Sequence, residues 1–185
     1  MSDQIPRLSL DEMPPKLASA LAPRVARLGY LGEFFQCTAH QPDALLSFLE
    51  LTEHLKHSLP NDLTEIVALT VAVLMDNDYE RVQHERLSRK LGFGEDLLKE
   101  TLSLSTNGRQ HLSERERLVQ QLVIAVVRRG GRDTTPELNA VIRAVDPAQA
   151  IGVLMLIGRY MSHAMIVNTL NLAPPALALA SETRA

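Results

Sequence analysis

The positions of proline and glycine constrain this 185-residue chain more than any other feature of its sequence. Proline is accepted in the first turn of a helix, and glycine is favoured just beyond the last turn. The segments between these residues carry apolar residues at helical spacing, and none shows strand alternation bounded by turn residues. The sequence therefore predicts an all-α protein with about eight or nine helices and no sheet.

The expected helices have boundaries that can be read from these residues. The first is expected to bend or break at Pro23, because a proline inside a helix removes a backbone hydrogen bond. The segment from Ile66 to Met75 is apolar on every side, which is typical of a buried helix. The expected helices cover about residues 14–28, 32–40, 42–58, 61–77, 79–91 and 94–104, and three more begin at Ser113, Thr134 and Asp146.

Composition and charge exclude several classes of function. The net charge is −3 and there is no run of Lys or Arg, so neither nucleic acid nor a membrane is an expected partner. The apolar stretch 151–172 contains Arg159, His163 and two Asn, which favours a core or subunit-interface helix over a membrane span. The single cysteine, Cys37, excludes a disulfide framework and any C-x-x-C pair.

The chain is long enough for one domain with a sizeable core. We expect a flexible N-terminus over residues 1–12, a single helical domain over 13–175 and a C-terminal tail over 176–185. No signal peptide is evident in the first dozen residues, so a cytoplasmic location is expected.

Three ionisable residues are the best candidates for chemistry. Glu80 and His84 are four residues apart, so they lie on one face of a helix and can touch. Glu65 lies in the first turns of the preceding apolar helix, where a carboxylate is costly to bury unless it is paired. If the two helices pack antiparallel, Glu65 can reach the imidazole and raise its basicity. Spacing alone leaves open that Glu80 and His84 form an ordinary solvated surface pair.

The segment LPNDLTEIVALTVAVLMDNDYERVQHERLSRKLG (residues 59–92) resembles the core motif of the alkylhydroperoxidase D and carboxymuconolactone decarboxylase superfamily. That motif has a Glu, a gap of eleven residues, two positions three apart, and a His four further on. Glu65, Asn77, Glu80 and His84 occupy these positions. The helices over 40–55, 112–127 and 152–170 are similar too, so the resemblance covers most of residues 30–175. It implies a compact alkylhydroperoxidase D-like helical fold that assembles as a homo-oligomer.

The departure from the motif is chemically decisive. In the peroxidases of this superfamily the two middle positions are cysteines, and the residue before the second is a His of the proton relay. Here these positions hold Asn77, Glu80 and Tyr79. A dithiol peroxidase needs a reactive thiolate and a resolving thiol. Since the motif has neither, the resemblance implies the decarboxylase branch, with acid–base chemistry on a small organic acid and no redox-active cysteine or cofactor.

This resemblance implies a role for each motif residue. His84 would be the general acid/base, Glu80 would shuttle a proton or act as its partner, and Glu65 would orient the imidazole. Tyr79 and Asn77 would donate hydrogen bonds to the substrate.

Two further assignments stay open at this point. Arg159 could anchor a substrate carboxylate, or it could form an ion pair at a subunit interface. A divalent metal on Glu65, Glu80 and His84 has no strong signature, so no metal is expected.

Three functions therefore compete for this sequence. The first is a carboxymuconolactone decarboxylase-like enzyme, the second a peroxidase-like antioxidant protein, and the third a non-catalytic binding or scaffold protein. Retention of Glu65 and His84 favours the first, because a scaffold need not keep a costly buried carboxylate.

Overall fold

The computed structural model describes residues 5–105 and 111–174, and these fold into nine α-helices and one short 3-10 helix without any strand. The all-α expectation is therefore confirmed. The 3-10 helix η1 covers Leu10–Glu12. The α-helices are α1 (Pro15–Leu28), α2 (Glu33–Thr38), α3 (Pro42–Ser58), α4 (Asn61–Leu74), α5 (Asp78–Lys90), α6 (Glu95–Ser103), α7 (Glu114–Arg129), α8 (Thr135–Ala144) and α9 (Pro147–Thr169).

Local capping chemistry sets many of these boundaries. Ser113 and Glu116 form the predicted capping box at the start of α7, and the Asp146 side chain accepts a hydrogen bond from the Gln149 N–H at the start of α9. Helix α1 continues through Pro23 rather than breaking there.

Helix α4 ends at Leu74, three residues earlier than the sequence indicated. Asp76 adopts a positive φ of 49°, and Asn77 caps the next helix instead of extending this one.

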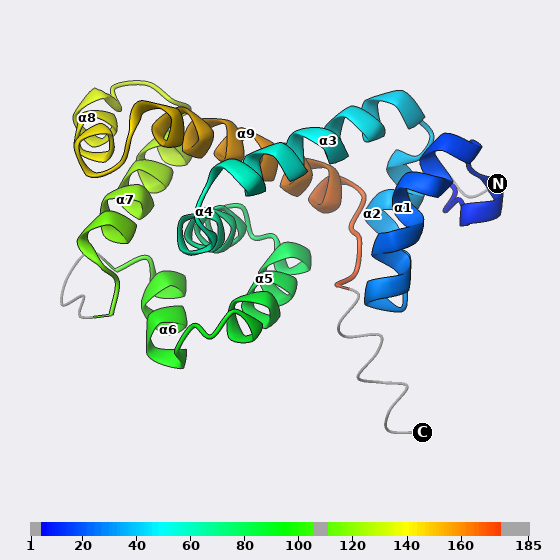
Figure 1. Ribbon diagram of the computed structural model, residues 1–185, viewed down its shortest axis with the longest axis horizontal. Coiled ribbons are helices and arrows are strands. Elements are labelled where there is room, and N and C mark those ends of the chain that lie inside the picture. Colours follow the sequence, from blue (N-terminus) through cyan, green and yellow to red (C-terminus); the bar gives the residue numbers. More distant parts are fainter. Residues whose placement is uncertain (1–4, 106–110, 175–185) are drawn as a thin grey trace.

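Helix α4 is the centre of the molecule. Its residues from Leu63 to Ala72 are all buried, as its uniformly apolar sequence requires. It packs against α5, α7 and α9, and Figure 1 shows it end-on beneath the crossing pair α3 and α9. The main hydrophobic core therefore lies around α4, with side chains from α3, α7, α8 and α9 closing it.

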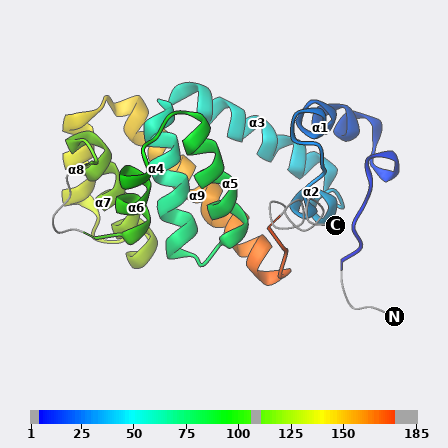
Figure 2. The ribbon, with the colours of Figure 1, turned by 90° about the horizontal axis from the view of Figure 1, so that it is seen from below.

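A second, smaller hydrophobic cluster joins the N-terminal part to this body. Leu17 and Leu21 of α1 and Phe34 and Cys37 of α2 pack there with Tyr79 of α5. In Figures 1 and 2, α1 and α2 lie at one end of the molecule and α7 and α8 at the other. Helices α4, α5 and α9 therefore lie in the middle, between the two ends.

The two chain ends are only partly described. Within the segment expected to be flexible, η1 is closed by a capping box of Ser9 and Glu12, and the Leu8 N–H donates to the Gln36 carbonyl at 3.2 Å. Residues 1–4 and the predicted tail over 176–185 lie outside the described residues.

Helix α9 is long and apolar enough to cross a membrane by composition, with a mean hydropathy of 1.6. Most of that window is buried inside the protein, and the helix carries Arg159 and His163 on its buried side. It therefore serves as a core helix of this fold, in line with the interpretation of its sequence.

Candidate active site

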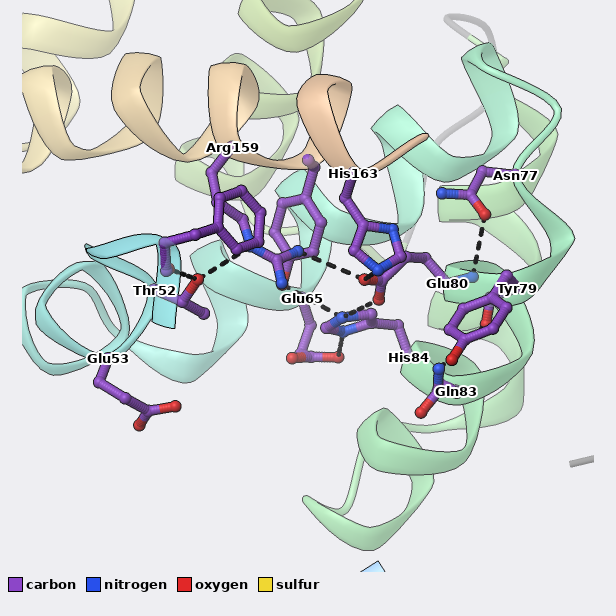
Figure 3. Close-up of polar contacts among 12 residues, drawn as sticks. Thr52, Glu53, Glu65, Asn77, Tyr79, Glu80, Gln83, His84, Arg159 and His163 are labelled. Carbon is purple, nitrogen blue, oxygen red and sulfur yellow. Dashed lines mark hydrogen bonds and ion pairs between the residues drawn. The ribbon is translucent and has the colours of Figure 1, made fainter. Parts of the chain in front are cut away.

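A cluster of buried polar side chains lies where α4, α5 and α9 meet, and α3 adds one residue (Figure 3). It contains the three residues expected to carry chemistry. Its members are Thr52 from α3, Glu65 from α4, Glu80, His84 and Ser88 from α5, and Arg159, Tyr160 and His163 from α9.

His84 lies between two carboxylates. Its Nδ1 is 2.9 Å from Oε2 of Glu65, and its Nε2 is 3.1 Å from Oε2 of Glu80. Burial disfavours the charged imidazole, but the charge and hydrogen bond of Glu65, helped by Glu80, raise the pKa of His84 to about 9. At neutral pH this residue is therefore an imidazolium whose two N–H groups both face carboxylates.

Glu65 holds the imidazole from the α4 side. Its Oε2 also accepts a hydrogen bond of 3.1 Å from the Ser88 hydroxyl, one turn after His84. The side chain of Glu65 is 3% exposed, so water cannot replace these partners. The antiparallel contact between Glu65 and His84 that the sequence suggested is thus present, and Ser88 was not anticipated.

Glu80 is the central acceptor of the cluster. Its Oε2 faces His84. Its Oε1 lies 3.0 Å from Nε2 of His163 and 3.3 Å from a guanidinium nitrogen of Arg159. Burial favours the neutral acid, yet His163, the hydrogen bond from His84 and the Arg159 charge together hold the pKa of Glu80 well below its usual range. Glu80 is therefore a carboxylate shared by three donors.

Arg159 belongs to this internal network. Its Nε donates to the Thr52 hydroxyl at 3.1 Å, and its guanidinium lies over the rings of Phe48 and Tyr160 at 4.9 and 4.3 Å. Its guanidinium therefore faces Glu80 of the same chain, and Arg159 also lines the cavity described below.

His163 belongs to the cluster although sequence reasoning did not select it. Its ring stacks on Phe34 at 4.0 Å, and its Nε2 must carry the hydrogen because it faces Glu80. Burial lowers the pKa of His163 and outweighs the charge and hydrogen bond of Glu80, which act in the opposite direction. His163 is thus a neutral imidazole, and its buried Nδ1 has no hydrogen-bond partner among the described residues.

A usable signal for His163 existed in the sequence. Arg159 and His163 are four residues apart in an otherwise apolar helix, so both lie on one face.

Tyr160 adds a hydroxyl 3.1 Å from Nε2 of His84. Burial raises the pKa of Tyr160, which keeps it a phenol.

Asn77 and Tyr79 both make contacts within the protein, and Tyr79 also lines the cavity described next. The Asn77 side-chain oxygen accepts the backbone N–H of Glu80 at 3.2 Å, so this residue caps α5 and fixes the start of the helix. The Tyr79 ring packs against His163 at 5.6 Å, and its hydroxyl lies directly against Gly32. Any side chain at position 32 would collide with that hydroxyl.

A cavity of about 200 Å³ opens above Glu80 and His84. Its lower part is formed by the charged cluster, and Tyr30, Phe35 and Leu87 contribute to its walls. The Tyr30 hydroxyl donates to the Gln83 side chain at 3.2 Å, which links the loop after α1 to α5 across one side of the cavity. The N-terminal part of the chain therefore supplies one wall of the site.

Cys37 does not line this cavity. It is 3% exposed and packs in the smaller hydrophobic cluster, where burial raises the pKa of its thiol. Within the described part of the chain, no three His, Cys, Asp or Glu side chains are placed to hold a metal ion together. Glu65, Glu80 and His84 direct their polar atoms at one another instead.

Solved structures share this fold. A cysteine-to-alanine variant of the debrominase Bmp8 in complex with 2,3,4-tribromopyrrole superposes with a TM-score of 0.79 at 14% identity, covering 94% of this chain and 92% of that one. The alkylhydroperoxidase AhpD core of an uncharacterized peroxidase-related protein from Ralstonia eutropha JMP134 gives 0.79 at 14% identity, covering 91% and 90%. An uncharacterized peroxidase-related protein from Silicibacter sp. TM1040 gives 0.74 at 14% identity, covering 94% and 95%.

These likenesses confirm the alkylhydroperoxidase D-like fold that the motif implied. No protein-family model matches the sequence, and no curated protein matches it. At these identities the shared feature is the arrangement of helices, so the chemistry must be argued from the residues of this chain.

Proposed function

We propose that this protein is an enzyme that performs acid–base chemistry on a small organic acid, as a carboxymuconolactone decarboxylase-like lyase without redox-active cysteines. One observation carries the proposal. His84 is held as an imidazolium between two buried carboxylates at the base of a cavity. A group that is protonated at neutral pH and lines a cavity is suited to deliver a proton.

The residues around His84 have separate tasks in this reaction. Glu65 and Ser88 fix the ring from the Nδ1 side, so only the Nε2 proton can be transferred. Glu80 and the Tyr160 hydroxyl lie at Nε2, where the substrate would compete with them for that proton. Arg159 and His163 keep Glu80 ionised and in place, so they act as positioning residues.

A decarboxylation on this site balances as follows. The bond between the carboxylate carbon and the rest of the substrate breaks, and its electron pair stays on the substrate as carbon dioxide leaves. His84 transfers its Nε2 proton to the resulting carbanion and becomes neutral, then regains a proton from solvent. The cost of the anionic intermediate falls because His84 transfers a proton to it.

A thiol peroxidase is poorly supported by the same geometry. The peroxide-reducing route needs a thiolate and a resolving thiol. Cys37 is buried away from the cavity with a raised pKa.

The first test screens small carboxylic acids for a rise in melting temperature, then follows carbon dioxide release from those that bind. We expect His84→Gln to lower turnover by about 10²–10⁴-fold, the usual contribution of a general acid. Turnover of the parent protein should fall as the pH rises above about 9, because His84 then loses its proton.

The matched controls are His57→Gln, which removes an exposed histidine on α3, and Cys37→Ser. Both should keep full turnover. If hydroperoxide consumption were found and disappeared with Cys37→Ser while His84→Gln kept it, the thiol route would replace this proposal.

A further inference from the structure

The cavity has a rim of positive charge distinct from the cluster at its base. Five cations from three helices line it besides Arg159: Arg24 and Arg27 of α1, Lys56 of α3, and Arg86 and Lys90 of α5. Glu80 is the one carboxylate among the lining residues. The residues that line this cavity therefore carry a net positive charge, although the chain as a whole is acidic.

The base of the cavity is balanced within itself. Glu65 and Glu80 supply two negative charges, and the His84 imidazolium and Arg159 supply two positive ones. His84 contacts both carboxylates, and Arg159 contacts Glu80. A ligand anion gains little by approaching this balanced set, because no uncompensated cation remains there.

The rim is not balanced. Arg24 pairs with Glu53 at 3.3 Å, and that glutamate is half exposed. Among the residues that the structure describes, Arg27, Lys56, Arg86 and Lys90 have no ion-pair partner. Lys56 is partly buried and the other three are exposed. Neighbouring cations without a carboxylate repel one another, and an anion between them relieves that repulsion.

Lys56 is the most informative of these residues. It is half-buried on α3 and lines the cavity together with Arg159 and Arg24. Burial lowers the pKa of Lys56, the Arg159 charge acts in the same direction, and the charge of Glu53 opposes them only in part. A half-buried ammonium that has no partner is an expensive group unless a ligand supplies the counter-charge.

Arg24 is held in a fixed position beside the same cavity. Its guanidinium lies over the Phe35 ring at 5.0 Å, which fixes the side chain at the mouth of the cavity. Burial lowers the pKa of Arg24, and Glu53 opposes that effect. Arg24 and Lys56 therefore face one space from two helices, with Phe35 and Tyr30 as apolar surface beside them.

We infer that Arg24 and Lys56, supported by Arg27, form an oxyanion-binding subsite at the mouth of the cavity, which takes a carboxylate or phosphate group of the ligand. The subsite deepens the proposed function, because it places the permanent charge of the substrate at the rim and its reacting part at His84. A small ligand with one anionic group that stays at the rim and a second carboxylate that leaves beside His84 fits this division.

The test measures binding of two probes, inorganic phosphate and succinate, by calorimetry and by melting temperature at constant ionic strength. The uncharged succinamide is the reference ligand. We expect phosphate, succinate or both to bind and succinamide not to bind. Lys56→Gln and Arg24→Gln should each weaken the binding by roughly 10- to 100-fold, the effect of losing one charged hydrogen bond. The preferred probe shows whether the subsite takes a carboxylate or a phosphate.

The matched control is Lys16→Gln, which removes one charge from the exposed surface of α1 and does not line the cavity. It should bind the probes like the parent protein. An equal loss in this variant, or no binding of either anion, would overturn the subsite. The parent protein separates the two proposals: if it binds the anions but turns over no acid, the subsite stands and the enzyme is contradicted. His84→Gln should keep the anion binding and lose turnover.

Discussion

Two buried polar groups lie on opposite sides of α4, and they differ in charge. On one side Gln120 of α7 donates to the Thr70 hydroxyl at 3.3 Å and to the Thr101 carbonyl at 2.8 Å. On the other side Glu65 belongs to the charged cluster. The neutral group lines neither cavity found in the described structure, whereas the charged one forms the base of a cavity.

This difference separates polar groups that serve packing from those that serve chemistry. A neutral amide on two oxygen acceptors costs little to bury and specifies how α4, α6 and α7 meet. Two carboxylates, an imidazolium and a guanidinium cost several kcal/mol each to desolvate, and apolar residues of similar volume are often at least as stable. The charged cluster, whose burial costs the most free energy, is the one that lies beside a cavity.

The largest expected effect comes from removing the centre of the charged cluster. Glu80→Leu would leave Arg159 and the His84 imidazolium without their shared acceptor. We expect a loss of about 3–5 kcal/mol in the free energy of unfolding, the usual result of breaking a buried ion pair. Urea denaturation at pH 7 measures it. A loss under about 1 kcal/mol would mean that the cluster is more hydrated than its burial indicates.

The second effect is on the pH dependence of stability. The pKa of His84 is raised to about 9 in the folded protein, against about 6.5 in the unfolded chain. Its stabilisation is therefore fully present below pH 6.5 and is lost as the pH rises to about 9. The integrated change is about 3 kcal/mol.

Unfolding experiments from pH 6 to pH 9.5 measure this dependence. His84→Gln should remove most of it, and Gln120→Met should keep it, because the neutral group does not titrate in this range. A parent protein whose stability is flat over this range would contradict the raised pKa.

The smallest expected effect is on the neutral side of α4. Gln120→Met keeps the volume, removes two hydrogen bonds and also removes an Oε1 atom that has no partner among the described residues. These contributions oppose each other, so the free energy of unfolding should change by about 1 kcal/mol or less. A much larger loss, seen by the same urea denaturation, would show that the neutral group also carries a substantial share of the stability.

The sequence was sufficient for the parts of this structure that depend on local signals. Capping by Ser113 and Asp146 and the uniformly apolar stretch around Val67 act within one turn or one helix, so their consequences can be predicted from a single segment. The contact of Glu80 with His84 follows from their spacing of four residues for the same reason.

The partners from α9 could not be predicted in this way. Arg159 lies 79 residues from Glu80 and 107 residues from Thr52 along the chain. Spacing within one helix carries no information about which face of a distant helix meets it. The cations at the rim of the cavity could not be predicted for a similar reason. Arg24 and Lys56 come from different helices and meet only in the folded protein.

The position of α9 at the end of the described fold has a consequence for synthesis. When the chain emerges from its N-terminus, α4 and α5 are complete before Arg159, Tyr160 and His163 have been made. Until α9 docks, Glu80 has only His84 as an ionic partner, and the apolar surface of α4 is uncovered. The last long helix therefore closes the core and assembles the site in one step, so a chain truncated before it would lack both.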